Sequence, residues 1–312
     1  MMKKLVSLIM LCAVMISSFS MQVFAEDTVF INDNFENSNS DNWWDNTGRG
    51  EKNIEGTWRN KYLALTSNSD SFYNYQAKDV YSTGILYCDF DIQFNSGDME
   101  IQLRESRDVS ATGFTMAGRI RKVAYYLEYF SNGEYYKMTS YGSNDWFTLN
   151  DTSKWYTIKM SFDIKQNKYN IYLLDRDTEK ILSQVENIDF YGDCDYINYF
   201  AFSSSGKLCI DNVDIRELDI DNIKISGEIY PTIPSWGNEK YSYNANSIRN
   251  NSSNIIDDVK WSIVIPKDGI SINESSGVLT VTSAAEPGPV MLYVEKEYQP
   301  FLNTTFLIDL ER

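Results

Sequence analysis

Seven residues in the first half of the chain, six of them aromatic and one an arginine, could bind a ligand. Three tryptophans occur early among Asn and Gly residues, a fourth follows the loop-like run Gly142-Ser143-Asn144-Asp145, and two tyrosines and an arginine fall on strand-like segments. A sugar ring stacks its apolar C–H faces on aromatic side chains, while its hydroxyls need fixed polar partners. The combination predicts ligand-binding roles for Trp43, Trp44, Trp58, Arg104, Tyr126, Tyr136 and Trp146. The alternative for each aromatic residue is a place in the core, where most of them lie in a β-sandwich.

The chain contains no histidine. This removes the most common general base, the His-containing catalytic triads and the usual zinc and copper sites. Glycoside hydrolysis by two carboxylates needs no histidine, but Glu100 and Glu105 are five residues apart and would face opposite sides of a regular strand. A polysaccharide lyase that uses Tyr and Arg stays open, because Arg104, Arg119 and Tyr126 could share one face. The sequence therefore assigns no catalytic residue and keeps an enzyme as an alternative.

Residues 1–25 have the layout of a secretory signal peptide and are excluded from the fold. Lys3 and Lys4 precede an apolar run, and small residues end the segment at Ala25. Its removal deletes two lysines, so the formal net charge changes from −16 to −16 − 2 = −18. This negative field repels the phosphates of nucleic acids and anionic lipid headgroups. We expect an extracellular protein, secreted or at the cell surface, with no nucleic-acid partner and no membrane insertion.

Three cysteines remain beyond the signal segment, which permits at most one disulfide. Apolar side chains occupy every second position from Leu86 to Phe94, so Cys88 is predicted to be a small core residue. The pair that the sequence favours for a disulfide is Cys194 with Cys209.

The composition changes sharply along the chain. All six prolines lie beyond residue 230, whereas most aromatic residues precede it. A closing strand-like segment ends near Leu218, and another begins at Ile223. We therefore predict a first domain over residues 26–218 and a second over residues 219–312.

Period-two patterns before this boundary indicate half-buried strands. From Tyr156 to Ile164 every second side chain is apolar, and Gln166-Asn167-Lys168 predicts a turn into a partner strand over residues 169–174. Similar segments cover residues 84–94, 99–104, 123–130, 135–140 and 197–203. The predicted fold class is all-β: a two-sheet jelly-roll sandwich, followed by an immunoglobulin-like β-sandwich of about seven strands.

The second domain carries a recognisable order of motifs. Val259-Lys260-Trp261-Ser262-Ile263, then Gly269-Ile270-Ser271-Ile272 and Gly277-Val278-Leu279-Thr280-Val281, resembles bacterial immunoglobulin-like and cadherin-like repeats. The resemblance covers nearly all of residues 219–312. It implies a spacer, stalk or adhesive unit displayed outside the cell, with no chemistry of its own.

The two ends of the first domain also carry a resemblance. Asp33-Asn34-Phe35-Glu36 and Ile210-Asp211-Asn212-Val213-Asp214-Ile215, with Trp155-Tyr156-Thr157-Ile158 between them, resemble jelly-roll lectins and carbohydrate-binding modules of the concanavalin and laminin-G type. In such modules the first and last strands lie side by side, and an acid from each can hold a structural calcium ion. The resemblance implies Glu36 and Asp211 for that role; the alternative is that Asp211 and Asn212 shape a strand bulge.

These observations predict a secreted or cell-surface, non-catalytic protein that binds an extracellular polysaccharide or other glycan and carries an immunoglobulin-like spacer. They imply no cofactor apart from the structural calcium ion. One alternative is a glycoside hydrolase or polysaccharide lyase that works with carboxylates or with Tyr and Arg. The other is a surface adhesin with a protein partner.

Overall fold

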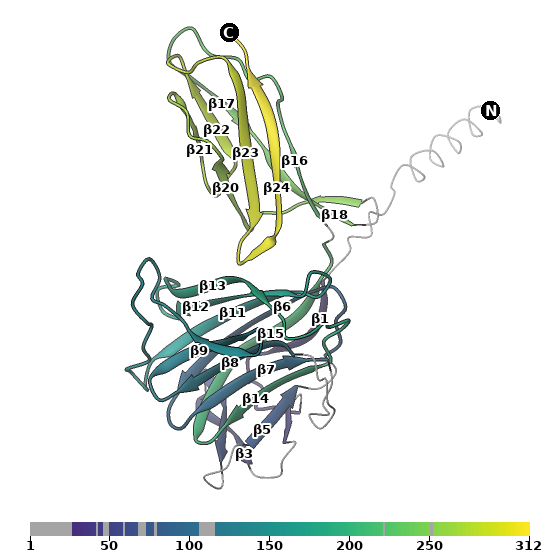
Figure 1. The fold of residues 1–312 in the computed structure, drawn as a ribbon, viewed down its shortest axis with the longest axis vertical. Helices are drawn as coiled ribbons and strands as arrows, with labels where there is room; N and C mark the ends of the chain where they lie inside the picture. Colours follow the sequence, from purple (N-terminus) through teal and green to yellow (C-terminus); the bar gives the residue numbers. More distant parts are fainter. Residues whose placement is uncertain are drawn as a thin grey trace, which may run out of the picture.

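The computed structural model describes residues 27–41, 43–45, 50–58, 60–67, 73–77, 80–105, 116–220, 222–249 and 252–312. The predicted signal peptide lies outside these ranges. Every regular secondary-structure element within these ranges is a β-strand, and the strands form two sandwiches that follow one another along the chain (Figure 1). The all-β fold class is therefore confirmed.

The first sandwich contains strands β1 to β15 in two sheets. The eight-stranded sheet has the order β13 (Ile181–Asp189), β12 (Lys168–Asp175), β11 (Trp155–Asp163), β6 (Ile85–Phe94), β15 (Lys207–Leu218), β4 (Asn60–Ser67) and β3 (Gly50–Thr57), with β1 (Thr28–Asp33) also paired to β15. The seven-stranded sheet has the order β10 (Glu134–Lys137), β9 (Tyr126–Ser131), β8 (Met116–Val123), β7 (Met99–Arg104), β14 (Tyr199–Ser204), β5 (Tyr73–Ala77) and β2 (Trp43–Asp45). The first and last strands, β1 and β15, are antiparallel neighbours, as the resemblance implied.

Alternating side chains explain why these strands pack into two layers. On β6, the side chains from Leu86 to Phe94 that the sequence placed inward, Cys88 among them, are buried. Phe90 meets Phe200 and Phe202 of the opposite sheet at ring-centroid distances of 6.0 and 5.2 Å. The predicted hairpin is also confirmed, because β11 and β12 pair antiparallel across the turn.

The second sandwich contains strands β16 to β24 in three sheets of three strands. These are β16 (Asn222–Ser226), β18 (Asn244–Arg249) and β19 (Ser252–Ile255); β17 (Asn238–Ser242), β22 (Val278–Thr282) and β21 (Ile270–Ile272); and β20 (Val259–Ile263), β23 (Gly288–Lys296) and β24 (Gln299–Leu310). They enclose a second hydrophobic core that includes Trp261. The immunoglobulin-like assignment of this sandwich stays a prediction.

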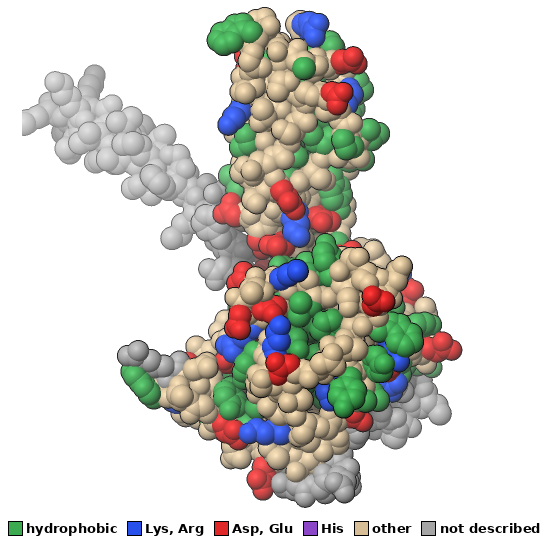
Figure 2. Space-filling model, turned by 90° about the vertical axis from the view of Figure 1, so that its left-hand side faces the viewer, with side chains coloured by type: hydrophobic (Ala, Val, Ile, Leu, Met, Phe, Trp, Pro, Cys, Tyr) green, Lys and Arg blue, Asp and Glu red, His purple; other side chains and the backbone are tan. Residues whose placement is uncertain are grey.

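The two sandwiches meet where the turn between β23 and β24 approaches the eight-stranded sheet (Figure 1). Tyr87 on β6 and Leu218 at the end of β15 belong to the second hydrophobic core, so the second sandwich covers part of this sheet's outer face. Acidic and basic side chains intermingle at the junction (Figure 2). The predicted boundary at Leu218 itself stays a prediction.

The three described cysteines are all free and buried. The predicted disulfide between Cys194 and Cys209 is therefore wrong. The Cys194 thiol donates to the carbonyl oxygen of Tyr196, and the Cys209 thiol donates to the side-chain oxygen of Asn95, each over 3.0 Å. Each sulfur is held in its own polar contact instead of pointing toward the other.

Candidate functional site

A compact group of charged side chains lies on the outer face of the eight-stranded sheet. Asp91 on β6 stands directly opposite Thr157 on β11 and Asp211 on β15 in the strand register. Phe90 and Ile92 on either side of Asp91, and Ile210 before Asp211, are buried in the core, so alternation turns both aspartates outward. The register thus places two carboxylates side by side on adjacent strands, where opposite Cβ atoms are about 5 Å apart.

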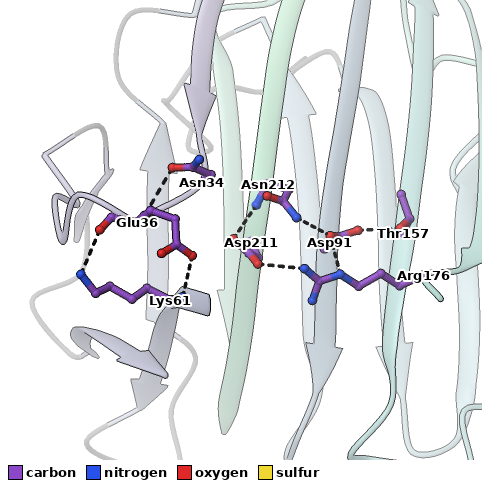
Figure 3. Close-up of polar contacts among 8 residues, drawn as sticks. All are labelled: Asn34, Glu36, Lys61, Asp91, Thr157, Arg176, Asp211 and Asn212. Atoms are coloured by element: carbon purple, nitrogen blue, oxygen red, sulfur yellow. Dashed lines mark hydrogen bonds and ion pairs between the residues drawn. The ribbon is translucent and has the colours of Figure 1, made fainter. Parts of the chain in front are cut away.

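Arg176, directly after β12, joins the two carboxylates. Its Nε lies 2.9 Å from Asp91 Oδ2, and one of its terminal nitrogens lies 3.1 Å from Asp211 Oδ2 (Figure 3). The guanidinium carbon is 5.0 Å from the centre of the Trp155 ring, within cation–π range. One planar cation therefore bridges three neighbouring strands.

A β-bulge on β15 completes the group. The register shifts between Asp211 and Asp214, and Asn212 within the bulge has a positive φ of 49°, a left-handed conformation that Asn tolerates better than most residues. The Asn212 backbone N–H donates to Asp211 Oδ1 over 2.9 Å, and its side-chain amide donates to Asp91 Oδ2 over 2.7 Å. Thr157 donates to Asp91 Oδ1 over 2.6 Å. The sequence alternative of a bulge at Asp211 and Asn212 is confirmed.

Burial raises the pKa of Asp211 to about 6, because the side chain is almost fully withdrawn from water. The negative charge of Asp91 raises it further, whereas the Asn212 N–H and the Arg176 guanidinium favour the ionised form and lower it. Both aspartates are bound by internal partners, so the group ties strands together and presents no free carboxylate to a substrate.

The structure does not bring the two predicted calcium ligands to a common point. Glu36 Oε1 accepts a hydrogen bond from the Lys61 backbone N–H over 2.8 Å, and the Lys61 ammonium donates to the Glu36 carbonyl oxygen over 2.9 Å. These contacts lie away from Asp211, which is bound to Arg176 (Figure 3). Within the described ranges, no three or more acidic, Cys or His side chains form a group that could hold a metal ion. The calcium ion stays a prediction.

A cavity of about 530 Å³ separates this charged face from the second sandwich. On one side it is lined by Lys159 and its neighbours, and on the other by Glu297 and Tyr298 of the β23–β24 turn. The Tyr298 ring packs edge-on against the Tyr172 ring, with the two centroids 5.2 Å apart. The Lys159 ammonium lies 4.8 Å from the centroid of the Tyr298 ring. Lys159 also forms an ion pair of 2.7 Å with Asp89. Five acidic residues and two basic residues line the cavity, so its wall carries an excess of negative charge.

A second cluster lies at the β10 end of the seven-stranded sheet, where two of the predicted binding residues meet. Tyr126 begins β9 and Trp146 forms an isolated bridge to Thr139; their rings pack edge-to-face, with centroids 5.9 Å apart. The Lys137 ammonium, at the end of β10, lies 3.6 Å from the Tyr126 centroid and 4.0 Å from the Trp146 centroid. Trp146 is 56% exposed. We call these three residues the aromatic–lysine cluster.

A polar hollow adjoins the aromatic–lysine cluster. The loop from Thr139 to Asn144, together with Gln184 of β13, lines a depression of about 360 Å³. Hydroxyl and amide groups line it, and Tyr141 contributes a ring that is 56% exposed. Because Thr139 bridges Trp146, this hollow begins at the cluster's edge. The region therefore combines the aromatic planes and fixed polar groups that a sugar site needs.

The other predicted binding residues lie elsewhere. Trp43 is fully buried, 5.3 Å from the Phe202 ring in the core, and Arg104 is buried with its guanidinium 4.0 Å from the Tyr199 ring centre. The predicted ligand-binding roles of Trp43 and Arg104 are therefore corrected, because neither side chain offers an accessible surface to a ligand. Trp58 is 75% exposed at the turn between β3 and β4, away from the cluster in the strand order.

Two predicted residues remain. The Tyr136 ring stacks on Tyr129 at 5.6 Å. Strand alternation turns Tyr136 to the face opposite Lys137, so it does not join the aromatic–lysine cluster. The Trp44 side chain lies outside the described part of the structure.

Sequence reasoning missed the two cations that organise these groups. Lys137 lies within the predicted strand 135–140, two residues from Thr139, and alternation alone could have placed both on one face. Arg176 follows the predicted strand 169–174, and no local pattern connects it to Asp91 and Asp211, which are far away in the sequence.

Comparisons with known proteins describe the fold only. No family model and no curated protein matches the sequence. Among solved structures, a sialidase matches over 62% of this chain and 19% of its own, with 14% identity and a TM-score of 0.47. A galectin-like protein of unknown function from Bacillus subtilis matches over 62% and 97%, with 9% identity and a TM-score of 0.41. A carbohydrate-binding module from Bacillus subtilis matches over 55% and 93%, with 14% identity and a TM-score of 0.33.

Within the ranges that the structure describes, no helix has the length and hydrophobicity that crossing a bilayer requires.

Proposed function

We propose that this chain is a non-catalytic glycan-binding protein that acts outside the cell and holds sugar at the aromatic–lysine cluster and its adjoining hollow. The observation that carries the proposal is that the exposed Trp146 meets the partly buried Tyr126 beside hydroxyl and amide groups on one edge of the sandwich. An exposed indole gains stability when a sugar C–H face covers it, and the nearby polar groups can exchange hydrogen bonds with sugar hydroxyls.

The enzymatic alternative has less support. The two carboxylates that lie side by side, Asp91 and Asp211, share Arg176 and accept hydrogen bonds from Thr157 and Asn212. A glycosidase needs one protonated acid and one free carboxylate on either side of the scissile bond. Here both groups face the same cation, which favours a structural role.

The second sandwich acts in this proposal as a spacer that presents the first. Its turn residue Tyr298 and the shared core residues Tyr87 and Leu218 give the two sandwiches a defined contact. A surface adhesin with a protein partner remains the second candidate, and the experiment below separates the two.

The test is binding of the full chain to a panel of immobilised plant, host and microbial polysaccharides. We expect at least one glycan to bind, and Trp146→Ala to weaken that binding by about tenfold, since loss of one stacking ring removes roughly 1–2 kcal/mol. Trp236→Ala is the matched control, because Trp236 is 83% exposed on the second sandwich. Silence across the whole panel, or equal losses in the two variants, would remove the proposal in favour of the adhesin.

A further inference from the structure

The outer face of the seven-stranded sheet carries a row of alternating charges. Glu100 on β7, Arg121 on β8, Glu128 on β9 and Lys137 on β10 stand opposite one another in successive strand registers. Arg121 forms an ion pair of 2.7 Å with Glu128, and Glu100 is bound by the neighbouring Arg119. Both acids of the row are thus neutralised by arginines.

Lys137 is the cation left over in this row. In the described part of the structure, no carboxylate lies within ion-pair distance of its ammonium group, which lies over the rings of Tyr126 and Trp146. Glu128, its opposite neighbour in the register, is already held by Arg121 through two nitrogens. The row and Arg119 together carry three cations and two carboxylates, a net charge of +1, and the nearby Asp145 carboxylate accepts a hydrogen bond from the Ser143 hydroxyl over 3.1 Å.

The two rings hold the Lys137 ammonium in place but provide no hydrogen-bond acceptor for it. Aromatic faces attract a cation through their quadrupole, but they supply no oxygen acceptor for the three N–H donors of a lysine. An oxyanion that approached the cluster would find a fixed cation next to the surface on which its ring could stack. Repulsion from distant acids is screened beyond roughly 8 Å at physiological ionic strength, so the local cation decides the contact.

We infer that the aromatic–lysine cluster selects acidic glycans, in which the carboxylate or sulfate of a sugar residue pairs with Lys137 while an adjacent ring stacks on Trp146. This inference rests on the proposed function, since it assigns a ligand class to the same site. A basic ligand is disfavoured because the Lys137 ammonium already lies over one face of each ring and would repel a second cation.

The experiment compares matched acidic and neutral polymers on the full-length mature chain. Polygalacturonate against its methyl ester tests a carboxylate source, and dextran sulfate against dextran tests a sulfate source. We expect an acidic polymer to bind about tenfold more tightly than its neutral counterpart, as for one charge-assisted contact at a partly exposed site. Lys137→Met should remove this preference, whereas Lys137→Arg should retain it.

Lys240→Met is the matched control, because Lys240 is an exposed lysine on β17 of the second sandwich and its loss changes the net charge equally. A preference that survives in Lys137→Met, or that Lys240→Met removes to the same extent, overturns the inference. Binding to a neutral glycan of the panel without any preference for acidic polymers also overturns it, but leaves the proposed function standing. Silence across the whole panel removes both.

Discussion

Replacement of Asp211 by Asn is expected to remove a specific pH dependence of stability from the first sandwich. Burial raises the pKa of this carboxyl from 3.8 to about 6 in the folded protein, whereas in the unfolded chain it returns to its ordinary value. Between these two values the folded state binds more protons than the unfolded state. Stability from this group is therefore fully present below pH 3.8 and is lost as the pH rises toward 6.

The size of the effect follows from the difference of roughly two pH units between folded and unfolded protein. Each unit corresponds to about 1.4 kcal/mol, so the wild-type chain should lose about 3 kcal/mol relative to Asp211→Asn between pH 3.5 and 7. The attraction of Arg176 for the ionised form of Asp211 is already contained in this pKa, because the guanidinium stays charged throughout the range. Only the slope of the difference is predicted.

The assay is urea unfolding at a series of fixed pH values, with tryptophan fluorescence as the signal. Asp189→Asn is the control: its ion pair with Lys168 lowers the pKa of that carboxyl, so Asp189 is ionised in both states above pH 5 and its difference curve should be flat there. A flat curve for Asp211→Asn would show that burial does not dominate. A slope of opposite sign would show that the Arg176 charge outweighs burial.

Two further predictions concern the core. Gly118→Ala should lower the free energy of unfolding by about 1–3 kcal/mol, because a new Cβ would overlap the buried Phe162 ring. The measurement is a urea titration, and an unchanged free energy would show that the ring can move aside. In a chain without residues 1–25, a thiol reagent such as DTNB should react at pH 8 only after unfolding, because the described cysteines are free, buried thiols. A reducing agent should leave the melting temperature unchanged for the same reason. Rapid labelling of the folded protein would contradict this. Burial raises the pKa of Cys209 to about 11, which further limits its reactive thiolate. The thiols concerned are Cys88, Cys194 and Cys209.

The sequence contained most of what was needed for the strands of the first sandwich. From Tyr156 to Ile164 the alternation reports burial directly, because a strand in a two-layer sheet turns every second side chain into the core. The same rule placed Cys88 correctly. It could not recover β3 and β4, where apolar side chains do not alternate regularly over residues 50–67 and partner strands decide the fold.

The binding residues were predicted only in part, for a physical reason. A tryptophan in Asn-rich surroundings looks the same in the sequence whether it fills the core or faces water: Trp43 is buried beside Phe202, whereas Trp58 is exposed. Tyr126 and Trp146 were chosen by composition, and only the folded chain shows that they meet.

By itself, the sequence determined the all-β class, the change in composition along the chain, the acidic charge and the absence of histidine chemistry, because these follow from local periodicity and from counting residues. Tertiary structure alone decided which charged side chains form ion pairs and which do not. Asp91 and Asp211 on two neighbouring strands share the guanidinium of Arg176, which follows a third strand, while Lys137 lies between two rings. Such pairings depend on strand order and register across the sheets, and contacts between residues far apart in the chain leave no local pattern.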